Sequence, residues 1–326
     1  MVKIVCCVKQ YNNTGEDYMV TRKSFLNNIK DLLMAIPVAG LPWLKNIYAK
    51  DMVSSRDLVV VKAKTITDAS IAAMVKVGLQ EMGGIERFVK RGSKVIIKPN
   101  IAFNSTPDRA HTTNPSLVET VARICKNAGA QVTIMDRPVH NARLCYHSSR
   151  IEEAAKRAGV NCEYMNRDRF KTVHVPQGLN LDTVDVYEEI LEADCIINMP
   201  IAKHHNAAMV SLSMKNLMGV IGGNRGFYHV NLHRNIVDFN KAVKVHLIIM
   251  DGLRILTKHG PSSGGPEDIK ETKTIIFGIN PVMVDTYTAH YLFGIEPSSI
   301  GYLSLASNAG MGSINVNTYS VITKTV

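Results

Sequence analysis

Short apolar runs rich in β-branched residues alternate with helix-like patterns from Asp57 to the end of the chain. This alternation predicts an α/β protein whose mostly parallel sheet carries helices on both faces around a single compact core. We expect the α/β domain to span residues 51–326, with residues 1–50 as an N-terminal extension. The predicted strands are 58–61, 94–97, 131–135, 195–198, 246–250, 274–278 and 319–323. The predicted helices are 67–82, 115–128, 149–158 and 283–293.

The clearest predicted helix begins at Pro115. Asn114 is a preferred N-cap residue and proline is favoured in the first turn, where its missing N–H costs nothing. Gly129 follows the helix as its expected stop. The apolar positions recur at helical spacing and predict one buried face, formed by Leu117, Val121, Ile124 and Ala128.

Residues 203–219, KHHNAAMVSLSMKNLMG, place basic groups beside a segment that is apolar on nearly every side. The pattern predicts a buried helix on which Ser211 and Lys215, four residues apart, share one narrow stripe. Removing an ammonium from water costs several kcal/mol unless a partner satisfies it. We therefore predict a cleft into which Lys215 points toward an anion. The alternatives are a lysine that reaches the surface or pairs with a structural carboxylate.

Polar residues follow several of the predicted strands. In open α/β sheets, ligands bind beyond the carboxyl ends of the strands, so these residues are the natural site set. They are Lys98, Asn100, Asp136, Lys203, His204 and Asp251. Either aspartate could equally cap a following helix or turn.

Two further features could contribute to an anion site. The hydroxyls of Thr112 and Thr113 precede a helix N-terminus, where free N–H groups favour anions, although ordinary capping is the alternative. Gly264 and Gly265 belong to a glycine-rich loop whose backbone could approach a ligand closely, and a mobile surface loop is the alternative. The complete predicted ligand-binding set is Lys98, Asn100, Thr112, Thr113, Asp136, Lys203, Ser211, Asn216, Gly264 and Gly265.

His229 and His233 are four residues apart, a spacing that would place both on one helix face and could suit a metal. No glutamate accompanies the pair as in a metalloprotease motif, so we favour His233 as a polar cleft residue and assign no metal ligand.

Composition narrows the classes of ligand. The net charge of +10 favours anionic partners, but the charge is dispersed and only 6% of residues are aromatic, which argues against nucleic acid. The six cysteines contain no CxxC pair, so the chain alone is not expected to hold an iron–sulfur cluster or a zinc ribbon. Cys125 and Cys195 fall in apolar patterns and are expected in the core.

The N-terminal region resembles an export signal. Thr21-Arg22-Lys23-Ser24-Phe25-Leu26 precedes an uncharged stretch and a passable cleavage site at Ile47-Tyr48-Ala49. The order is similar to a twin-arginine signal that starts at Met19, with Lys23 in place of the second arginine. Export to the periplasm is favoured over a cytoplasmic location, and an amphipathic helix is the alternative. No segment is long and apolar enough to predict a transmembrane helix.

Taken in order, several segments resemble the domain-of-unknown-function 362 family. They include RFVKRGSKVIIKPN, HTTNPSLVETVARICKNAGAQVTIMD, AKHHNAAMVSLSMKNLMGVI, LHRNIVDFN and MDGLRILTKHGPSSGGP, and the resemblance runs from about residue 57 to 312. It implies an uncharacterised activity, a twin-arginine signal in many members and, in some, an appended iron–sulfur segment whose cysteines this chain lacks. One departure is Met135-Asp136-Arg137-Pro138-Val139, where relatives tend to carry a glycine-rich turn, so a ligand there would face Arg137.

These observations lead to three functional hypotheses. The first is a protein that binds a small carboxylate or phosphate, either as an enzyme or as a binding protein. Lys98, Lys203 and Lys215 would neutralise the charge of this ligand, and in an enzyme His204, His233 or Lys215 would exchange a proton. The second is a non-catalytic or redox-accessory protein that partners an iron–sulfur protein. The third is a metal-dependent hydrolase using the two histidines of the HxxxH pair. No cofactor is identified.

Overall fold

The computed structural model describes residues 9–11, 17–19 and 57–326. The chain divides into two units, Met1–Ser54 and Ser55–Val326. In the first unit, β1 (Lys9–Tyr11) pairs with β2 (Asp17–Met19) in antiparallel orientation. The predicted export signal lies outside the described residues except for Met19 and stays a prediction, as does the domain boundary at residue 50.

The second unit is built on a ten-stranded sheet in the order β14-β3-β13-β12-β9-β4-β5-β6, with β10 beside β12 and β11 beside β10. Six of its nine strand pairings are parallel, because only β11 and β13 run against their neighbours. The predicted mostly parallel sheet is confirmed. Its strands are β3 (Leu58–Lys62), β4 (Lys94–Pro99), β5 (Gln131–Asp136), β6 (Asn161–Tyr164), β9 (Cys195–Met199), β10 (Ile201–His205), β11 (Met209–Ser211), β12 (Leu247–Leu256), β13 (Ile269–Gly278) and β14 (Val321–Thr325). A separate antiparallel pair joins β7 (Phe170–His174) to β8 (Thr183–Tyr187).

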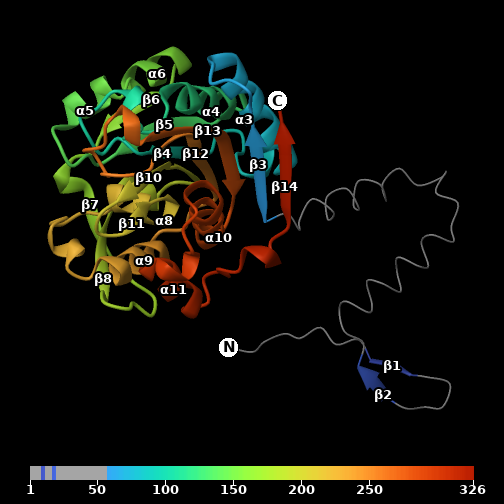
Figure 1. Ribbon diagram of the computed structural model, residues 1–326. Helices are drawn as coiled ribbons and strands as arrows, with labels where there is room; N and C mark the ends of the chain where they lie inside the picture. Colours follow the sequence, from blue (N-terminus) through green and yellow to red (C-terminus); the bar gives the residue numbers. More distant parts are fainter. Residues whose placement is uncertain (1–8, 12–16, 20–56) are drawn as a thin grey trace, which may run out of the picture. The chain divides into compact units, whose positions relative to one another are not determined.

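Helices cover both faces of the sheet, as predicted (Figure 1). Strand β3 shows why: Val59 and Val61 pack into one apolar cluster, while Leu58 and Val60 pack into the other. Because successive strand residues point to opposite faces, a continuous apolar run serves two cores. The first face carries α3 (Asp68–Glu81), α4 (Pro115–Asn127), α5 (Ala142–Ser148) and α6 (Ile151–Ala158). The second carries α7 (Glu188–Leu191), α8 (Ser213–Asn216), α9 (Leu232–Ala242), α10 (Pro281–Thr288) and α11 (Gly301–Asn308).

Several local predictions are confirmed in detail. The Asn114 side chain accepts hydrogen bonds from the N–H groups of Ser116 and Leu117 at the start of α4, and Gly129 takes a φ of +89° just after its end. Cys125 and Cys195 are fully buried.

The single helix predicted after Lys203, His204 and His205, within residues 203–219, is wrong. The segment instead forms a hairpin of β10 and β11, followed by α8 and the short 3₁₀ turn η6 (Leu217–Val220). Helical backbone begins only at Ser213, after an extended Leu212. An apolar run buried on both faces fits a strand as well as a buried helix, so periodicity alone did not distinguish them. The strand pairing of Lys203 with Ser211 nevertheless places these two residues side by side.

A buried carboxylate fixes the start of α8. Asp285, on α10, is fully buried. It accepts hydrogen bonds from the backbone N–H groups of Ser213 (2.7 Å) and Met214 (2.9 Å), and from the Ser213 hydroxyl (2.5 Å). Burial raises the pKa of Asp285 to about 7. This one side chain thereby satisfies two N–H groups of a helix only four residues long.

Replacing Asp285 with alanine should therefore destabilise the domain by about 2–5 kcal/mol, because two buried N–H groups would lose their acceptor. Asp168 is exposed and supplies the matched control Asp168→Ala. Urea unfolding followed by circular dichroism gives the two free energies. Equal stability of both variants would show that Asp285 does not anchor α8.

Candidate anion-binding site

The carboxyl ends of neighbouring strands meet at a cleft of about 370 Å³. Strands β4, β5 and β10 bring Lys98, Asp136 and Lys203 to this edge, and α8 adds Lys215. The volume is within the range of pockets that bind small molecules. Lys98, Asp136 and Lys203 were selected because ligands of open α/β sheets bind at the carboxyl ends of the strands, and the structure brings these three residues together there. Their roles do not follow from this position.

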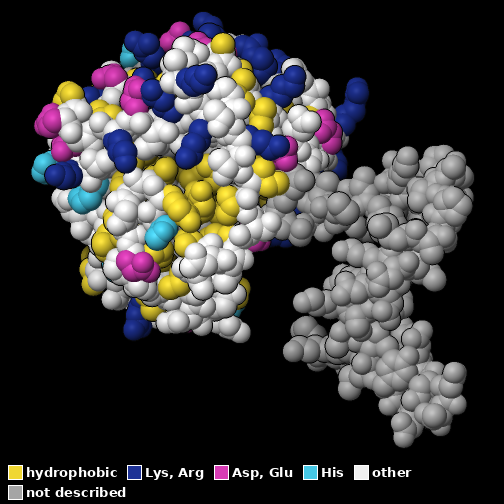
Figure 2. All heavy atoms as spheres, turned by 45° about the vertical axis from the view of Figure 1, so that its right-hand side comes forward, with side chains coloured by type: hydrophobic (Ala, Val, Ile, Leu, Met, Phe, Trp, Pro, Cys, Tyr) yellow, Lys and Arg dark blue, Asp and Glu magenta, His cyan; other side chains and the backbone are white. Residues whose placement is uncertain are grey.

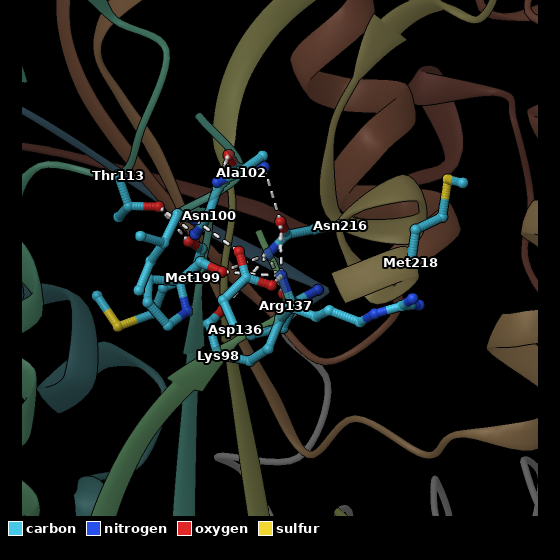
Figure 3. Close-up of polar contacts among 12 residues, drawn as sticks. Lys98, Asn100, Ala102, Thr113, Asp136, Arg137, Met199, Asn216 and Met218 are labelled. Carbon is cyan, nitrogen blue, oxygen red and sulfur yellow. Dashed lines mark hydrogen bonds and ion pairs between the residues drawn. The ribbon is translucent and has the colours of Figure 1, made fainter. Parts of the chain in front are cut away.

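Lys98 and Asp136 form an ion pair at the base of the cleft (Figure 3). The Lys98 ammonium lies 2.7 Å from Asp136 Oδ1 and also donates to the Pro99 carbonyl (2.8 Å) and to Asn216 Oδ1 (3.0 Å). The other Asp136 oxygen accepts the backbone N–H of Ile101 at 2.6 Å. Burial lowers the pKa of Lys98 to about 8, and Asp136 opposes that shift. Each charge of this pair is balanced by the other.

Asparagines tie α8 to the sheet edge. Asn216 Oδ1 accepts from Asn100 Nδ2 at 3.0 Å as well as from Lys98, and its own amide donates to Asn198 Oδ1 at 2.7 Å. Asn198 in turn donates to the Ser213 carbonyl at 2.9 Å. Asn216 was predicted as a ligand-binding residue, and it lines the cleft, but its polar atoms already have protein partners.

Lys203 is 1% exposed and has neutral partners only. Its ammonium donates to Asn100 Oδ1 (3.2 Å) and to the His111 carbonyl, and it lies 4.7 Å from the centre of the Phe103 ring. Burial, with the nearby Lys215 charge as the next cause, lowers the pKa of Lys203 well below its ordinary value.

Lys215 is the least satisfied cation of the cleft. Its side chain is buried, with the residue 9% exposed, and the ammonium finds only the Met218 thioether, a weak acceptor, at 3.6 Å. Burial lowers the pKa of Lys215 to about 7, and Arg225 and Lys98 lower it further by repulsion. No carboxylate of the described residues pairs with Lys215.

Two arginines complete the cationic wall. Arg137 donates to the carbonyls of Ile221 (2.7 Å) and Gly223 (2.8 Å). Arg225 donates to the carbonyls of Met218 (3.1 Å) and Arg137, and its Nε is buried without a partner. Neither guanidinium meets a carboxylate among the described residues. The expectation that a ligand would face Arg137 agrees with the position of that residue in the cleft wall.

The histidine assignments need correction. His204 does not line the cleft, because strand alternation turns it away and its Nδ1 accepts the Gly260 N–H at 3.1 Å. Its neighbour His205 lines the cleft instead. Since Nδ1 of His205 accepts the N–H groups of Ala207 (3.1 Å) and Ala208 (3.3 Å), Nε2 carries the proton. Burial lowers the pKa of His205 to about 3, so it is a neutral donor at physiological pH.

The HxxxH pair is separated by the structure. His229 lines the cleft and stacks on His205 with ring centres 6.3 Å apart, whereas His233 stacks on Tyr302 at 6.2 Å and does not line it. The expected common helix is interrupted, because α9 begins only at Leu232. The prediction of His233 as a cleft residue is therefore wrong. Within the described ranges, no three His, Cys, Asp or Glu side chains gather as a metal site requires.

Other predicted ligand contacts also lie outside the cleft lining. The Thr113 hydroxyl accepts the Asn100 N–H and donates to the Met199 carbonyl, a structural role, and Thr112 is buried. The Gly264 carbonyl accepts from Arg109, and the Gly265 N–H donates to Asp268. Asp251 accepts the backbone N–H groups of Asn114 (2.7 Å) and Leu253 (3.0 Å), a structural role that differs from capping a following helix. By contrast, the remaining predicted residues Asn100 and Ser211 do line the cleft.

Sequence reasoning missed Arg225, His205 and Phe103, which line the cleft, and considered His229, which also lines it, only as part of a possible metal pair. Phe103 and Arg225 stand in segments without helical or strand periodicity, so pattern gave no reason to select them. For His205, the adjacent pair of histidines was a signal, but which of the two faces the cleft depends on strand register.

The fold and the site define an α/β protein with a cationic cleft at the carboxyl edge of its sheet. Residues 95–290 match the family model "Domain of unknown function (DUF362)", and the chain belongs to this family. The Thylakoid-associated protein sll1697 of Synechocystis is 23% identical over 259 residues, which cover 73% of this chain and 79% of that protein. Among the described residues, no helix combines the length and apolar character that crossing a membrane demands.

Two solved structures are similar to the chain at low identity. One is the lactate racemase apoprotein from Thermoanaerobacterium thermosaccharolyticum, with a TM-score of 0.43, 13% identity and coverage of 67% of this chain and 53% of that one. The other is a Thermotoga maritima protein, with a TM-score of 0.34, 12% identity and coverage of 58% and 51%. The chain thus spans about half the length of either structure.

Gly219 allows the buried ion pair to form. A Cβ at this position would lie 1.8 Å from Asp136 Oδ1 and 2.6 Å from Lys98 Nζ. We expect Gly219→Ala to destabilise the fold by about 1–3 kcal/mol, because the pair must move apart in a packed interior. Gly226→Ala is the matched control, since Gly226 has a helical φ of −60° and its Cβ would meet nothing closer than 3.2 Å. Urea unfolding of both variants checks this, and equal losses would contradict it.

The depressed lysine pKa values give stability a specific pH dependence. Lys215 has a pKa of about 7 in the fold against an ordinary 10.5, so between these values the unfolded chain binds more protons. The free energy of unfolding should therefore rise with pH across this window. Lys98 acts in the same direction from about 8 upward.

Removal of Lys215 should weaken this dependence. We expect Lys215→Met to gain less stability than the wild type between pH 7 and 9, as measured by urea unfolding at each pH. An unchanged gain would show that the Lys215 ammonium is not desolvated in the native protein.

Proposed function

We propose that the protein binds a small carboxylate or phosphate anion in the cleft, with Lys215 as its principal charged contact. The single observation that carries this proposal is the buried Lys215 ammonium, whose protein partner is a thioether rather than an oxygen. A cation removed from water without a counter-charge is costly, and the cleft is open to a ligand that would supply one.

The charge balance of the cleft supports the same proposal. Among the described residues, five basic side chains line it, namely Lys98, Lys203, Lys215, Arg137 and Arg225, against the single carboxylate of Asp136. Because Lys98 takes that carboxylate, the other four described basic side chains have no carboxylate partner in the cleft. Carboxylates and phosphates match such a wall through charge-assisted hydrogen bonds. The low-dielectric surroundings would strengthen each of these contacts.

Catalysis on the bound anion would depend on Lys215. His204 and His233 stand outside the cleft, and His205 is held neutral, so none of them serves as the proton-exchanging base expected from the sequence. With a pKa of about 7, Lys215 can exist in both charge states near neutrality and is the group suited to that task.

A partner-binding role is a second candidate, favoured by one observation. Figure 2 shows apolar side chains gathered into a patch on one face of the domain. Large apolar residues with much of their surface exposed include Tyr291 and Ile279. Contiguous exposed apolar surface is typical of interaction sites. The suggestion that such a partner is an iron–sulfur protein comes from the family resemblance alone.

The anion proposal is tested by titrating phosphate and pyruvate into the protein in a calorimeter. Lys215→Met should weaken binding by about 2 kcal/mol, roughly 30-fold, because it removes a desolvated charge that faces the anion. The fold should survive, since the substitution removes an unpaired buried charge. The exposed Lys244 provides the control Lys244→Met, which should bind as the wild type does.

Two results would contradict the proposal. One is the absence of any anion binding by the wild-type protein. The other is a Lys215→Met variant that loses stability while it keeps its affinity, which would identify Lys215 as a structural residue.

A further inference from the structure

We infer that Lys215 is a carbonyl-reactive lysine, and that the anion bound in the cleft is a small 2-oxo acid that forms an imine with it. This inference rests on the proposed function and adds the substrate class. It starts from a difference among the three lysines of the cleft. All three are buried, but their ammonium groups differ in the hydrogen-bond partners that they have.

Lys98 and Lys203 are held by their partners. The Lys98 ammonium has three oxygen acceptors, one of them a carboxylate. The Lys203 ammonium has two oxygen acceptors and an aromatic face. Either lysine would have to break several contacts before its nitrogen could attack a ligand. Both are therefore suited to holding charge in place.

Lys215 has none of these restraints. Among the described residues, the one hydrogen-bond partner of its ammonium is the Met218 sulfur at 3.6 Å, and its side chain lines the open cleft. A lysine that is desolvated and stands next to other cations is activated as a nucleophile, because its neutral form is favoured. Burial and the Arg225 charge shift the pKa of Lys215 in that direction, to about 7.

The two arginines of the cleft are the reason to expect a ligand with a carboxylate next to its carbonyl group. Arg225 and Arg137 line the same cleft, and Arg225 Nε is buried without a partner. A guanidinium matches a carboxylate in geometry as well as charge. A 2-oxo acid places its carboxylate one bond from the carbonyl carbon, so the ligand can be held by the arginines while its carbonyl meets Lys215.

The reaction balances without a further reagent. The neutral Lys215 amine attacks the carbonyl carbon, a C–N bond forms, and the carbonyl π electrons move to oxygen. That oxygen takes up a proton while the nitrogen gives one up, which leaves a neutral carbinolamine. The resulting carbinolamine loses its oxygen as water with one more proton from solvent. The C–O bond breaks and a protonated imine remains.

The test is reductive trapping. The full-length protein is incubated with pyruvate and treated with sodium borohydride, which delivers hydride to the imine carbon and leaves a stable secondary amine. Peptide mass mapping should find one modified site, Lys215. The yield should fall to the level of surface lysines in Lys215→Met and stay unchanged in Lys244→Met.

The outcomes separate this inference from the proposed function. Wild-type protein without a Lys215 adduct overturns the inference, and so does labelling spread over surface lysines to the same extent in Lys215→Met. If calorimetry still detects phosphate or pyruvate binding in that case, the anion site stands and only the carbonyl chemistry fails. If no anion binds either, both fail together.

Discussion

The imbalance of charge at the carboxyl edge of the sheet is the constraint around which the site is organised. A folded domain rarely removes an ammonium from water without pairing it, because the desolvation cost is several kcal/mol. Here the one carboxylate of the cleft serves Lys98, and three lysines and two arginines line the same small volume. The structure tolerates this by giving most of the cations neutral oxygen acceptors. The remaining unsatisfied charge is concentrated on Lys215.

The fold produces this concentration by ordinary means. Parallel strands end at one edge, so residues far apart in the chain, such as Lys98, Asp136 and Lys203, arrive together. The short helix α8 adds Lys215 to the lining of the cleft, and the helix is held by a buried carboxylate on α10 and by the asparagines at the strand ends. Gly219 lets the adjacent turn pass close to the ion pair. Rigid packing, rather than a loop, therefore positions the reactive end of the cleft.

The sequence predicted the sheet and the strand-end residues because both follow from local patterns that repeat along the chain. It predicted Lys215 from a helix longer than the one that forms, because a lone lysine among buried apolar residues is unusual in a strand–turn–helix segment as well as in a long helix. It chose His204 over His205 because a one-residue change of register exchanges the two faces of a strand, and nothing local fixes that register. Arg225 was missed because its position depends on backbone carbonyls in distant segments, which periodicity cannot reveal.

The difference between the lysines also explains why a lysine, rather than an arginine, suits position 215. An arginine keeps its charge at any physiological pH and would add a fixed cation to a wall that already has two. A lysine can lose its proton when the cleft is empty and regain it, or react, when a counter-charge arrives. Under the proposed function, a bound anion would relieve repulsion that the folded state otherwise carries, and would therefore stabilise the native protein by mass action as well as occupying the site. Ligand binding and the stability of the sheet edge would then be coupled through a single ammonium group.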